Sequence, residues 1–527
     1  MNFAIIAAGE GSRLRKEGFD KPKPMVRLEG EMLVERLIRI FKDNGAESIN
    51  IIINAHSPQL EAFLIDLKAR EPLLNLIIKS TLSSAHSFYS ILGNIGFENK
   101  ELCLTTVDTI FDEEVFKEYI SAFVADKTLD ALMATTSYVD DEKPLWVSAD
   151  DEGMIKEYSS EQRSPRPLVS GGIYCLRAEA LSVAKSAMEQ NVSRMRNYQQ
   201  MLVEKGCKVK SFEFAKILDI DHVGDIDKAK AFLEIGKRRV LFVERAKRFS
   251  PSCEQKDERL FDNICSCLRA EGIRLTTVCE DDLEKVNPLS FDLILSMARS
   301  EKALDILSNC ETAGIRVVNS VKGSRNCFRE SMNELLRQSG VMNPRFIITD
   351  GRKKKIKGRD NKTDSRFDFP LQDGVWVKRA DFQTETKDDV VFCKDSTSLD
   401  KAVETLNRRG IDKVLICEHI VGRLVKLYRI SGTPFCEYFA PSEDKFGENL
   451  HQTTDVPDLD RAKLVSLSDK VAEVLGLEVF GMDIIENEKG ECYIIDVNDF
   501  PSFSNYSQEA AKHICNKTLS LCKEVKR

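Results

Sequence analysis

The sequence predicts an α/β protein in two halves, each with a sheet of its own. Short apolar, β-branched stretches alternate with helical patterns through about residue 235, an order that favours a mostly parallel sheet covered on both faces. A fresh apolar strand begins near residue 240, and from about residue 319 longer strands return on themselves like hairpins. The 527 residues have room for about three or four domains of ~150 residues. We therefore expect an α/β domain at 1–236, a small α/β domain at 240–320 and an α+β domain at 321–527.

The first predicted strand runs directly into a loop that is suited to phosphates. Phe3–Ile6 is short and apolar, as expected of a central strand. Gly9 and Gly11 leave the following loop without side chains, so backbone N–H groups can approach a ligand closely. Hydrogen-bond donors and positive charge follow at Ser12, Arg13, Lys21 and Lys23. This order indicates a phosphate site, although the glycine spacing matches neither the dinucleotide-binding motif nor a P-loop.

The remaining elements of the first half follow from periodicity. Apolar residues recur at helical spacing from Leu33 to Phe41, Asn44 and Gly45 end that helix, and a last helix is expected near Asp225–Leu233. The further strands are expected at Ile49–Ile53, Leu74–Ile78, Leu102–Val107 and Leu132–Ser137.

The loop resembles the signature of nucleotidyltransferases that activate sugar phosphates and phospho-alcohols. The chain reads AAGEGSRL from Ala7 to Leu14 and KPMV from Lys23 to Val26, and the resemblance covers roughly residues 1–235. It implies a Rossmann-like, GT-A-type nucleotidyltransferase domain in which the loop wraps the phosphates of an NTP. The nucleotide-binding residues would be Ala7, Ala8, Gly9, Gly11 and Ser12. Arg13 and Lys23 would neutralise charge as a substrate phosphate attacks the α-phosphorus.

A divalent cation belongs in such a site, because two polyanions must meet and pyrophosphate must leave. Asp108 ends an apolar strand, where open α/β sheets bind ligands, although an Asp at such a place is more often a turn or a helix cap. The segment resembles the metal-binding strand of phosphocholine cytidylyltransferases, which implies that Asp108 holds Mg²⁺ or Mn²⁺. The later segment ILDIDHVGDI resembles the second metal segment of that group and puts the other ligand at Asp221, with Asp219 as the nearest rival.

Two departures from the common sugar-nucleotide enzymes bear on the substrate. Ser84–Leu92 resembles the stretch beside the base and substrate, but the glycine-rich sequence that hexose 1-phosphate enzymes carry there is missing. Their Glu-Lys-Pro motif is missing too. The resemblance therefore implies a smaller phospho-alcohol or polyol phosphate, with the nucleobase left open and cytidine favoured.

The second half has its own candidate cluster. Its small α/β unit is expected to use strands at Val240–Val243, Leu275–Val278, Leu293–Ser296 and Ile315–Val318. Near the end of the chain, Asp483 lies on one strand of a predicted hairpin, and Asp496 and Asn498 lie two residues apart on the other. Residues two apart on a strand share a face, so three oxygen ligands can converge there, and the carboxylates would repel each other without a cation.

These segments resemble the ATP-grasp fold, and the last is similar to inositol phosphate kinases of the inositol trisphosphate 5/6-kinase type. The family pattern F-G-x-D-I-I followed by I-D-x-N-x-F-P is read here as FGMDII and IDVNDFP. The resemblance implies that ATP is a substrate, that residues 240–320 form the pre-ATP-grasp domain, and that Asp483, Asp496 and Asn498 hold Mg²⁺. The residues implied to contact ATP are Lys378 and Arg329 at the phosphates, Glu418 at the hinge around adenine and ribose, and Lys426.

Composition excludes several classes of function. A net charge of −8 argues against a general nucleic-acid binder, and no apolar run approaches the ~20 residues that span a bilayer. The fifteen cysteines are scattered through apolar stretches, which favours reduced thiols in the cytoplasm over disulfides. The basic segment 352–366 is either a solvated loop or a flap that gathers phosphates. The oligomeric state is left open.

Three hypotheses follow. In the first, the ATP-grasp half phosphorylates a small alcohol or polyol, and the N-terminal half converts the phosphate to an NDP-activated product. In the second, the C-terminal half is an amide ligase that passes through an acyl phosphate. In the third, both halves are non-catalytic nucleotide-binding regulators, against which the intact charged residues argue. ADP release with an alcohol alone supports the first, a strict need for an amine the second, and ATP binding without turnover the third.

Overall fold

The computed structural model describes residues 1–96, 101–140, 143–250, 253–350, 369, 371, 373–381, 386–441, 452–453 and 459–525. The chain divides into two compact units, one formed by Met1–Lys237 with Ala270–Gly272 and the other by Arg238–Arg269 with Ile273–Arg527. The basic segment 352–366 lies outside the described residues. The finer boundaries near residues 240 and 320 stay predictions.

The first unit is built on a mixed sheet around strand β1. Strands β6, β1, β4 and β5 lie side by side and parallel, whereas β11 pairs antiparallel with β6 and β8. The alternation of strands and helices predicted the parallel part but not the antiparallel strands β9 to β11. The strands are β1 (Asn2–Ala7), β4 (Ser48–Ile53), β5 (Leu74–Ile78), β6 (Leu102–Thr106), β8 (Ala131–Thr136), β9 (Trp146–Ala149), β10 (Ile155–Ser159), β11 (Leu168–Leu176) and β12 (Val209–Phe214).

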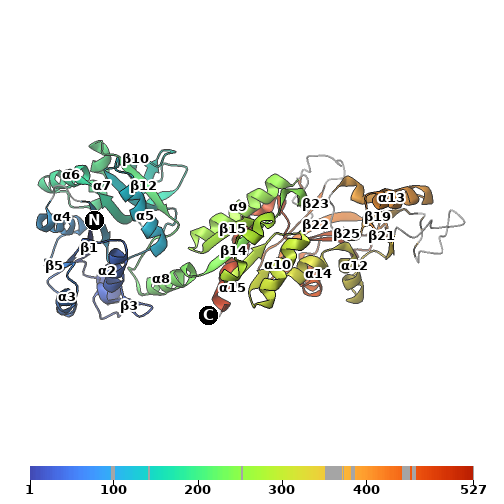
Figure 1. Ribbon diagram of the computed structural model, residues 1–527, viewed down its shortest axis with the longest axis horizontal. Coiled ribbons are helices and arrows are strands. Elements are labelled where there is room, and N and C mark those ends of the chain that lie inside the picture. Colours follow the sequence, from blue (N-terminus) through green and yellow to red (C-terminus); the bar gives the residue numbers. More distant parts are fainter. Residues whose placement is uncertain are drawn as a thin grey trace. The chain divides into compact units, whose positions relative to one another are not determined.

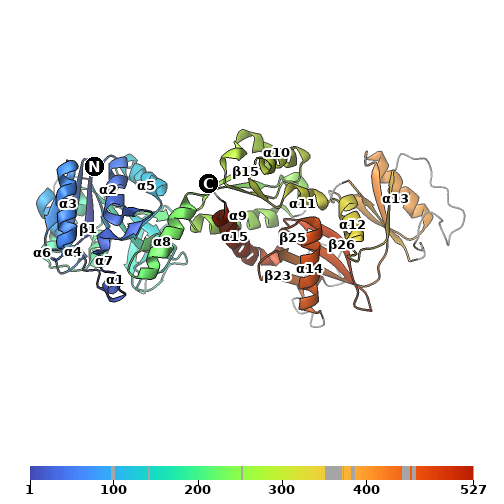
Figure 2. The same ribbon diagram turned by 90° about the horizontal axis from the view of Figure 1, so that it is seen from below.

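Helices cover both faces of this sheet because its strands are apolar on both sides. Phe3 and Ile5 of β1 pack in one core with α2, α3, α5 and α8, while Ala4 and Ile6 pack in another with α4, α6 and α7. Figure 1 shows these helices around the strands of the unit, and Figure 2 shows α2 and α3 beside β1. Their bounds are α1 (Ser12–Lys16), α2 (Leu33–Asp43), α3 (Pro58–Arg70), α4 (Ser84–Ile95), α5 (Glu113–Ala125), α6 (Ala178–Glu189), α7 (Met195–Glu204) and α8 (Val223–Gly236).

Two short ladders complete the unit. Strands β2 (Arg27–Leu28) and β3 (Glu31–Met32) follow the glycine loop, and β7 (Thr109–Ile110) pairs with β13 (Leu218–Asp219). The β7–β13 pairing matters for the site, because the Ile220 N–H donates to the Asp108 carbonyl at 3.2 Å. Segments that lie over a hundred residues apart in the sequence are joined in this way.

The second unit starts with a small parallel sheet and continues with two antiparallel ones. The parallel sheet has the order β15–β14–β16–β17, and the antiparallel sheets have the orders β18–β21–β19–β20 and β24–β23–β22–β25–β26. The parallel strands are β14 (Arg239–Glu244), β15 (Arg274–Cys279), β16 (Leu293–Ser296) and β17 (Arg316–Val318). The antiparallel strands are β18 (Phe346–Asp350), β19 (Val375–Arg379), β20 (Val390–Cys393), β21 (Lys413–Glu418), β22 (Arg423–Ile430), β23 (Cys436–Pro441), β24 (Gln452–Thr453), β25 (Val479–Glu486) and β26 (Cys492–Asp499).

Helices cover one face of the β22–β26 sheet and leave the other for the candidate site. Val425 and Leu427 of β22 share a core with helices α12 and α14, whereas Lys426 and Tyr428 between and after them are only half-buried. Figure 2 shows α12 and α14 near β25 and β26. The helices of the unit are α9 (Glu254–Ala270), α10 (Glu301–Thr312), α11 (Val321–Asn326), α12 (Arg329–Gln338), α13 (Ser396–Arg408), α14 (Arg461–Leu475) and α15 (Ser507–Glu524).

Two expectations from composition can be compared with the described residues. Within them, every helix is too short or too polar to cross a bilayer. No cysteine of the described chain forms a disulfide, and most cysteines are buried. Burial raises the pKa of thiols such as Cys103 and Cys327 and so keeps them protonated.

Candidate active sites

The glycine loop of the first unit forms the wall of a cavity of about 480 Å³. Because β1 and β6 run parallel, the loop after β1 and the turn after β6 meet at the same edge of the sheet. Of the residues that the sequence indicated for this half, Lys21 does not line the cavity. Those that do are Ala7, Ala8, Gly9, Gly11, Ser12, Arg13, Lys23, Asp108 and Asp221.

The conformation of the loop depends on glycine and on an asparagine below it. Gly11 has φ +60°, a left-handed conformation that side chains rarely adopt, and a Cβ there would lie 3.4 Å from Cβ of Lys23. Asn54, which directly follows β4, donates from Nδ2 to the carbonyl oxygens of Ala8 and Gly9 at 3.3 Å each. The two hydrogen bonds tie the loop to the end of β4 and so help to hold its backbone in place.

Lys23 is the centre of charge in this cavity. Its ammonium group contacts Asp108 Oδ2 closely and lies 2.9 Å from Asp221 Oδ1, and Arg13 Nη1 lies 2.7 Å from Asp221 Oδ2. Burial alone would lower the pKa of Lys23, but the charges and hydrogen bonds of Asp108 and Asp221 raise it above its ordinary value. Lys23 is therefore a cation at neutral pH. Asp219 pairs with Thr109 in the β7–β13 ladder instead and does not line the cavity.

The donors of this cavity fit a divalent cation that arrives with phosphates. Asp108 and Asp221 both reach the same ammonium group, so two carboxylates converge on one point. Within the described ranges, no group of three or more His, Cys, Asp or Glu side chains forms a metal site. Mg²⁺ commonly takes one or two carboxylates and fills its other positions with phosphate oxygens and water, so a pair is sufficient.

In the second unit, Lys426, Asp483 and Asp496 form a row across the β22–β25–β26 sheet, which we call the metal-ligand row. Lys426 lies opposite Asp483, and Asp483 lies opposite Asp496, so the three side chains share a face. Lys426 Nζ lies 3.2 Å from Asp483 Oδ2, and the charge of Asp483 raises the pKa of Lys426. Asn498 follows Asp496 on the same face, opposite Gly481.

A β-bulge beside this row presents a backbone acceptor. Asp483 pairs with Asp496 but Ile484 pairs with Ile494, which leaves Ile495 as an extra residue in β26. Lys378 on β19 is buried, and its Nζ donates to the Ile495 carbonyl at 3.2 Å. The bulge thus brings the predicted phosphate-binding lysine of one sheet next to the predicted metal ligands of the other.

Arg329 lies beneath the same row. Its side chain is 2% exposed, Nη2 lies 3.3 Å from Asp496 Oδ2, and Nη1 donates to the Arg379 carbonyl at 3.4 Å. The other carboxylate oxygen, Asp496 Oδ1, is buried and has no hydrogen-bond partner in the described chain. A buried acceptor without a donor is costly, so the donor set fits a cation at this oxygen.

Glu418 is set apart from this cluster. It ends β21, and its carboxylate is held by Arg345, whose backbone N–H donates at 2.8 Å and whose Nη2 lies 2.7 Å away. The structure therefore brings together Arg329, Lys378, Lys426, Asp483 and Asp496, with Asn498 two residues further on. It leaves the predicted hinge role of Glu418 as a prediction.

Sequence reasoning missed two groups of residues near these sites. Asn54 follows a strand without any motif, and Thr81 and Ser83 line the first cavity just ahead of the stretch singled out at Ser84–Leu92. Tyr428 shares the face of Lys426 in the second unit. The alternation of half-buried and buried residues in RLVKLYRI is a signal that could have found Tyr428.

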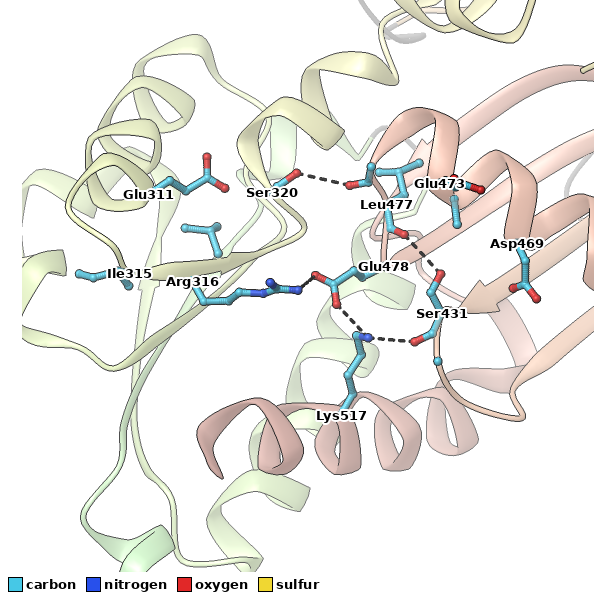
Figure 3. Close-up of a pocket in the computed structure, with 14 residues that line it drawn as sticks. Glu311, Ile315, Arg316, Ser320, Ser431, Asp469, Glu473, Leu477, Glu478 and Lys517 are labelled. Atoms are coloured by element: carbon cyan, nitrogen blue, oxygen red, sulfur yellow. Dashed lines mark hydrogen bonds and ion pairs between the residues drawn. The ribbon is translucent and has the colours of Figure 1, made fainter. Parts of the chain in front are cut away.

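A larger cavity of about 730 Å³ in the second unit contains none of the predicted site residues. Figure 3 shows Arg316 pointing toward Glu478 from the left and Lys517 from below. Arg316 Nη2 lies 2.8 Å from Glu478 Oε1, Lys517 Nζ lies 2.8 Å from Glu478 Oε2, and Lys517 also donates to the Ser431 carbonyl at 2.9 Å. Because Glu478 is paired with both Arg316 and Lys517, we interpret the cluster as one that stabilises the fold and does not bind a ligand.

Replacing Glu478 with glutamine is expected to destabilise the second unit. The side chains of Glu478 and Lys517 are less than a fifth exposed, so the change leaves a mostly buried ammonium without its anion. The expected cost is ~1–3 kcal/mol, seen as a lower midpoint of urea unfolding. Glu473→Gln is the matched control, because this exposed residue lines the same cavity. Equal midpoints for the two variants would contradict the assignment.

Two family models match parts of the chain. Residues 3–173 match the MobA-like NTP transferase domain, and residues 440–515 match the inositol 1,3,4-trisphosphate 5/6-kinase ATP-grasp domain. No curated protein matches the chain. The sequence therefore joins a nucleotidyltransferase fold to an ATP-grasp-like domain, which confirms the predicted fold class and both resemblances. The fusion of these two domains supports a bifunctional enzyme.

Solved structures are similar to parts of the chain. The inositol-1-phosphate CTP transferase from T. maritima is 22% identical, covers 44% of this chain and 96% of its own, and has a TM-score of 0.36. The D-alanine–D-alanine ligase from Bacillus anthracis complexed with ATP is 15% identical, covers 55% of this chain and 97% of its own, and has a TM-score of 0.42.

Proposed function

We propose that the chain makes an NDP-activated alcohol in two consecutive steps. The ATP-grasp half phosphorylates a small alcohol or polyol, and the nucleotidyltransferase half joins that phosphate to a nucleotide, with cytidine favoured, and releases pyrophosphate. The observation that carries the proposal is that each half gathers its own cations and carboxylates at one point. Lys23 meets Asp108 and Asp221 in the first unit, and Arg329 and Asp496 lie next to Lys378 in the second.

In the nucleotidyltransferase half, these residues neutralise and orient phosphates. The loop from Ala8 to Gly11 offers backbone N–H groups to the NTP, while Arg13 and Lys23 offset the charge that accumulates when a substrate phosphate approaches the α-phosphorus. A phosphate oxygen is already a nucleophile, so this half needs no general base. A Mg²⁺ ion held by Asp108 and Asp221 would stabilise the leaving pyrophosphate.

In the ATP-grasp half, Lys378 and Arg329 are placed to hold the phosphates of ATP. Both are buried cations at the edge of the metal-ligand row, where little water competes for a phosphate oxygen. Mg²⁺ held by Asp483, Asp496 and Asn498 would neutralise the phosphates during transfer. The proposed domains are 1–236 for nucleotidyl transfer, 240–320 before the ATP-grasp domain, and 321–527 for the ATP-grasp domain itself.

Consecutive reactions give a physical reason for the fusion, because a tethered pair of sites raises the local concentration of the intermediate. The fifteen cysteines, without a disulfide in the described ranges, support a reducing location such as the cytoplasm.

The order of the two steps can be tested in one reaction. Full-length protein given a free alcohol, ATP, CTP and Mg²⁺ is expected to form the CDP conjugate without added phospho-alcohol, as read by mass spectrometry. Asp483→Asn is expected to stall with the free alcohol and to recover when the phosphorylated alcohol is supplied, because only the first step uses Asp483. Asp108→Asn is expected to do the reverse and to accumulate phosphorylated alcohol and ADP.

The alternatives give different products in the same assay. A strict requirement for an amine and a carboxylate would establish the ligase hypothesis instead. Nucleotide binding without turnover by either half would leave a regulator.

A further inference from the structure

A second row of side chains lies beside the metal-ligand row of the ATP-grasp half. Glu437 of β23 pairs with Tyr428 of β22, Tyr428 with Gly481 of β25, and Gly481 with Asn498 of β26. Tyr428, Gly481 and Asn498 lie two residues from Lys426, Asp483 and Asp496 on their own strands, so both rows share one face of the sheet. Figure 1 shows β23, β22 and β25 as neighbours in this sheet. We call Glu437, Tyr428, Gly481 and Asn498 the Tyr428 row. Asn498, at its end, is also one of the predicted Mg²⁺ ligands.

Tyr428 is held in one position by its surroundings. A Cβ on Gly481 would lie 3.1 Å from Cδ1 of Tyr428, so the ring lies over the glycine and needs that space. Its ring centroid is 5.3 Å from that of Phe503 and 6.2 Å from those of Phe439 and Tyr506. Aromatic neighbours on three sides fix the direction of the hydroxyl group.

The hydroxyl of Tyr428 meets a strained backbone segment. Its oxygen lies 3.1 Å from Oγ of Ser504, and Phe500, Phe503 and Ser504 have φ values of 40°, 55° and 43°. Three non-glycine residues in the left-handed region within five positions are costly, and such strain persists where the surrounding structure over-determines it. Phe500 and Phe503 are fully buried and supply that anchor. The result is a pair of fixed hydroxyl groups, those of Tyr428 and Ser504, with Tyr428 on the face of the sheet that also carries Asn498.

The charges of the two rows differ. The metal-ligand row and its neighbours hold the cations Lys426, Lys378 and Arg329, which are engaged by Asp483, the Ile495 carbonyl and Asp496 respectively. The Tyr428 row carries a phenol, an amide and one carboxylate, that of Glu437. Glu437 Oε1 forms an ion pair with the exposed Arg461, whose Nη2 lies 3.5 Å away. An anionic acceptor placed here would face the carboxylate of Glu437. Lys426, two residues from Tyr428 on the same face, is already paired with Asp483, whereas an uncharged or cationic alcohol would gain hydrogen bonds without needing a cation.

From these observations we propose that Tyr428 and Ser504 form the subsite for the acceptor alcohol, and that this subsite selects an acceptor without negative charge. The inference rests on the proposed kinase activity of this half and adds the class of its substrate. The acceptor oxygen forms a bond to the γ-phosphorus of ATP, the bond between that phosphorus and the bridging oxygen breaks, ADP leaves with the electron pair, and the hydroxyl proton passes to solvent. Tyr428 and Ser504 bind and orient the acceptor.

The test measures ADP formation by the full-length protein with ATP and Mg²⁺ over three sets of alcohols and, as a separate probe for a ligase, with D-alanine. The uncharged and cationic sets contain glycerol, ribitol, ethanolamine and choline, and the anionic set contains glycerol 3-phosphate and ribitol 5-phosphate. Activity confined to the first two sets supports the inference. Activity with the anionic set alone would overturn the inference while the kinase proposal stands. ADP formation only with D-alanine, which supplies a carboxylate and an amine, would overturn both the inference and the kinase proposal. The absence of ADP formation with every probe would also overturn both.

The Tyr428→Phe variant tests the binding of the acceptor without disturbing the fold. Tyr428→Phe keeps the packed ring and removes the hydroxyl, so the KM for the best acceptor is expected to rise ~10-fold while the KM for ATP stays unchanged. Ser504→Ala is expected to shift the same constant in the same direction. The matched control is Tyr438→Phe, because Tyr438 neighbours Glu437 on β23 but packs against the helix-covered core on the other face. Unchanged acceptor KM in both site variants, or an equal change for acceptor and ATP, would refute the subsite.

Discussion

The Asp496→Asn variant is expected to bind ATP normally and to lose phosphoryl transfer by at least ~100-fold, because a ligand to the catalytic cation is removed from the transition state. Asparagine keeps the volume of the side chain and an oxygen for the buried Arg329, so the fold is retained. Nucleotide affinity can be measured by calorimetry and turnover by ADP release with the alcohol that the wild-type protein uses.

The matched control for this variant is Asp400→Asn, an exposed aspartate on α13. It is expected to leave both binding and turnover unchanged. Normal turnover by Asp496→Asn would mean that the row of Lys426, Asp483 and Asp496 serves the stability of the sheet and not the chemistry.

The Lys23→Gln variant is expected to lower pyrophosphate release by at least ~100-fold, because a positive charge aimed at the reacting phosphates is worth that much in a water-poor site. Lys23 is the cation that both Asp108 and Asp221 contact, and its side chain is 13% exposed. Glutamine can keep hydrogen bonds to the carboxylates, so the loss isolates the charge. The readout is pyrophosphate formed from CTP and a supplied phospho-alcohol.

Lys21→Gln provides the control, since Lys21 is an exposed lysine two residues earlier that does not line the cavity. ADP formation by the other half is expected to be the same in both variants. If Lys23→Gln released pyrophosphate at the wild-type rate, the glycine loop would not be a nucleotidyl-transfer site.

Local patterns predicted those parts of the sites that lie close together in the sequence. The strand before Gly9 and the Asp496–Asn498 pair each depend on spacing within a few residues, and the structure has them as predicted. The left-handed conformation of Gly11 was not predicted. Asp221 was preferred to Asp219 from a resemblance, and the structure turns it toward Lys23.

Features that depend on partners distant in the sequence could not be predicted. The bulge at Ile495 arises from how β26 pairs with β25, and neither strand reveals it alone. The antiparallel strand β11 enters the first sheet beside β6, although the alternation of helices and strands around it favours parallel pairing. Asn54 supports the glycine loop from another strand, and its sequence surroundings give no sign of that role.

The buried cysteines allow the rate at which each unit opens to be measured by alkylation. Cys103 and Cys175 lie inside the first unit, and Cys327 and Cys436 lie inside the second. A thiol reacts with an alkylating reagent only as an exposed thiolate, so a buried cysteine is modified no faster than the structure around it opens. Pulse alkylation followed by peptide mass spectrometry therefore measures the opening rates of both units in one sample, without any engineered label. Alkylation rates measured with and without each nucleotide would show which unit that nucleotide stabilises against opening.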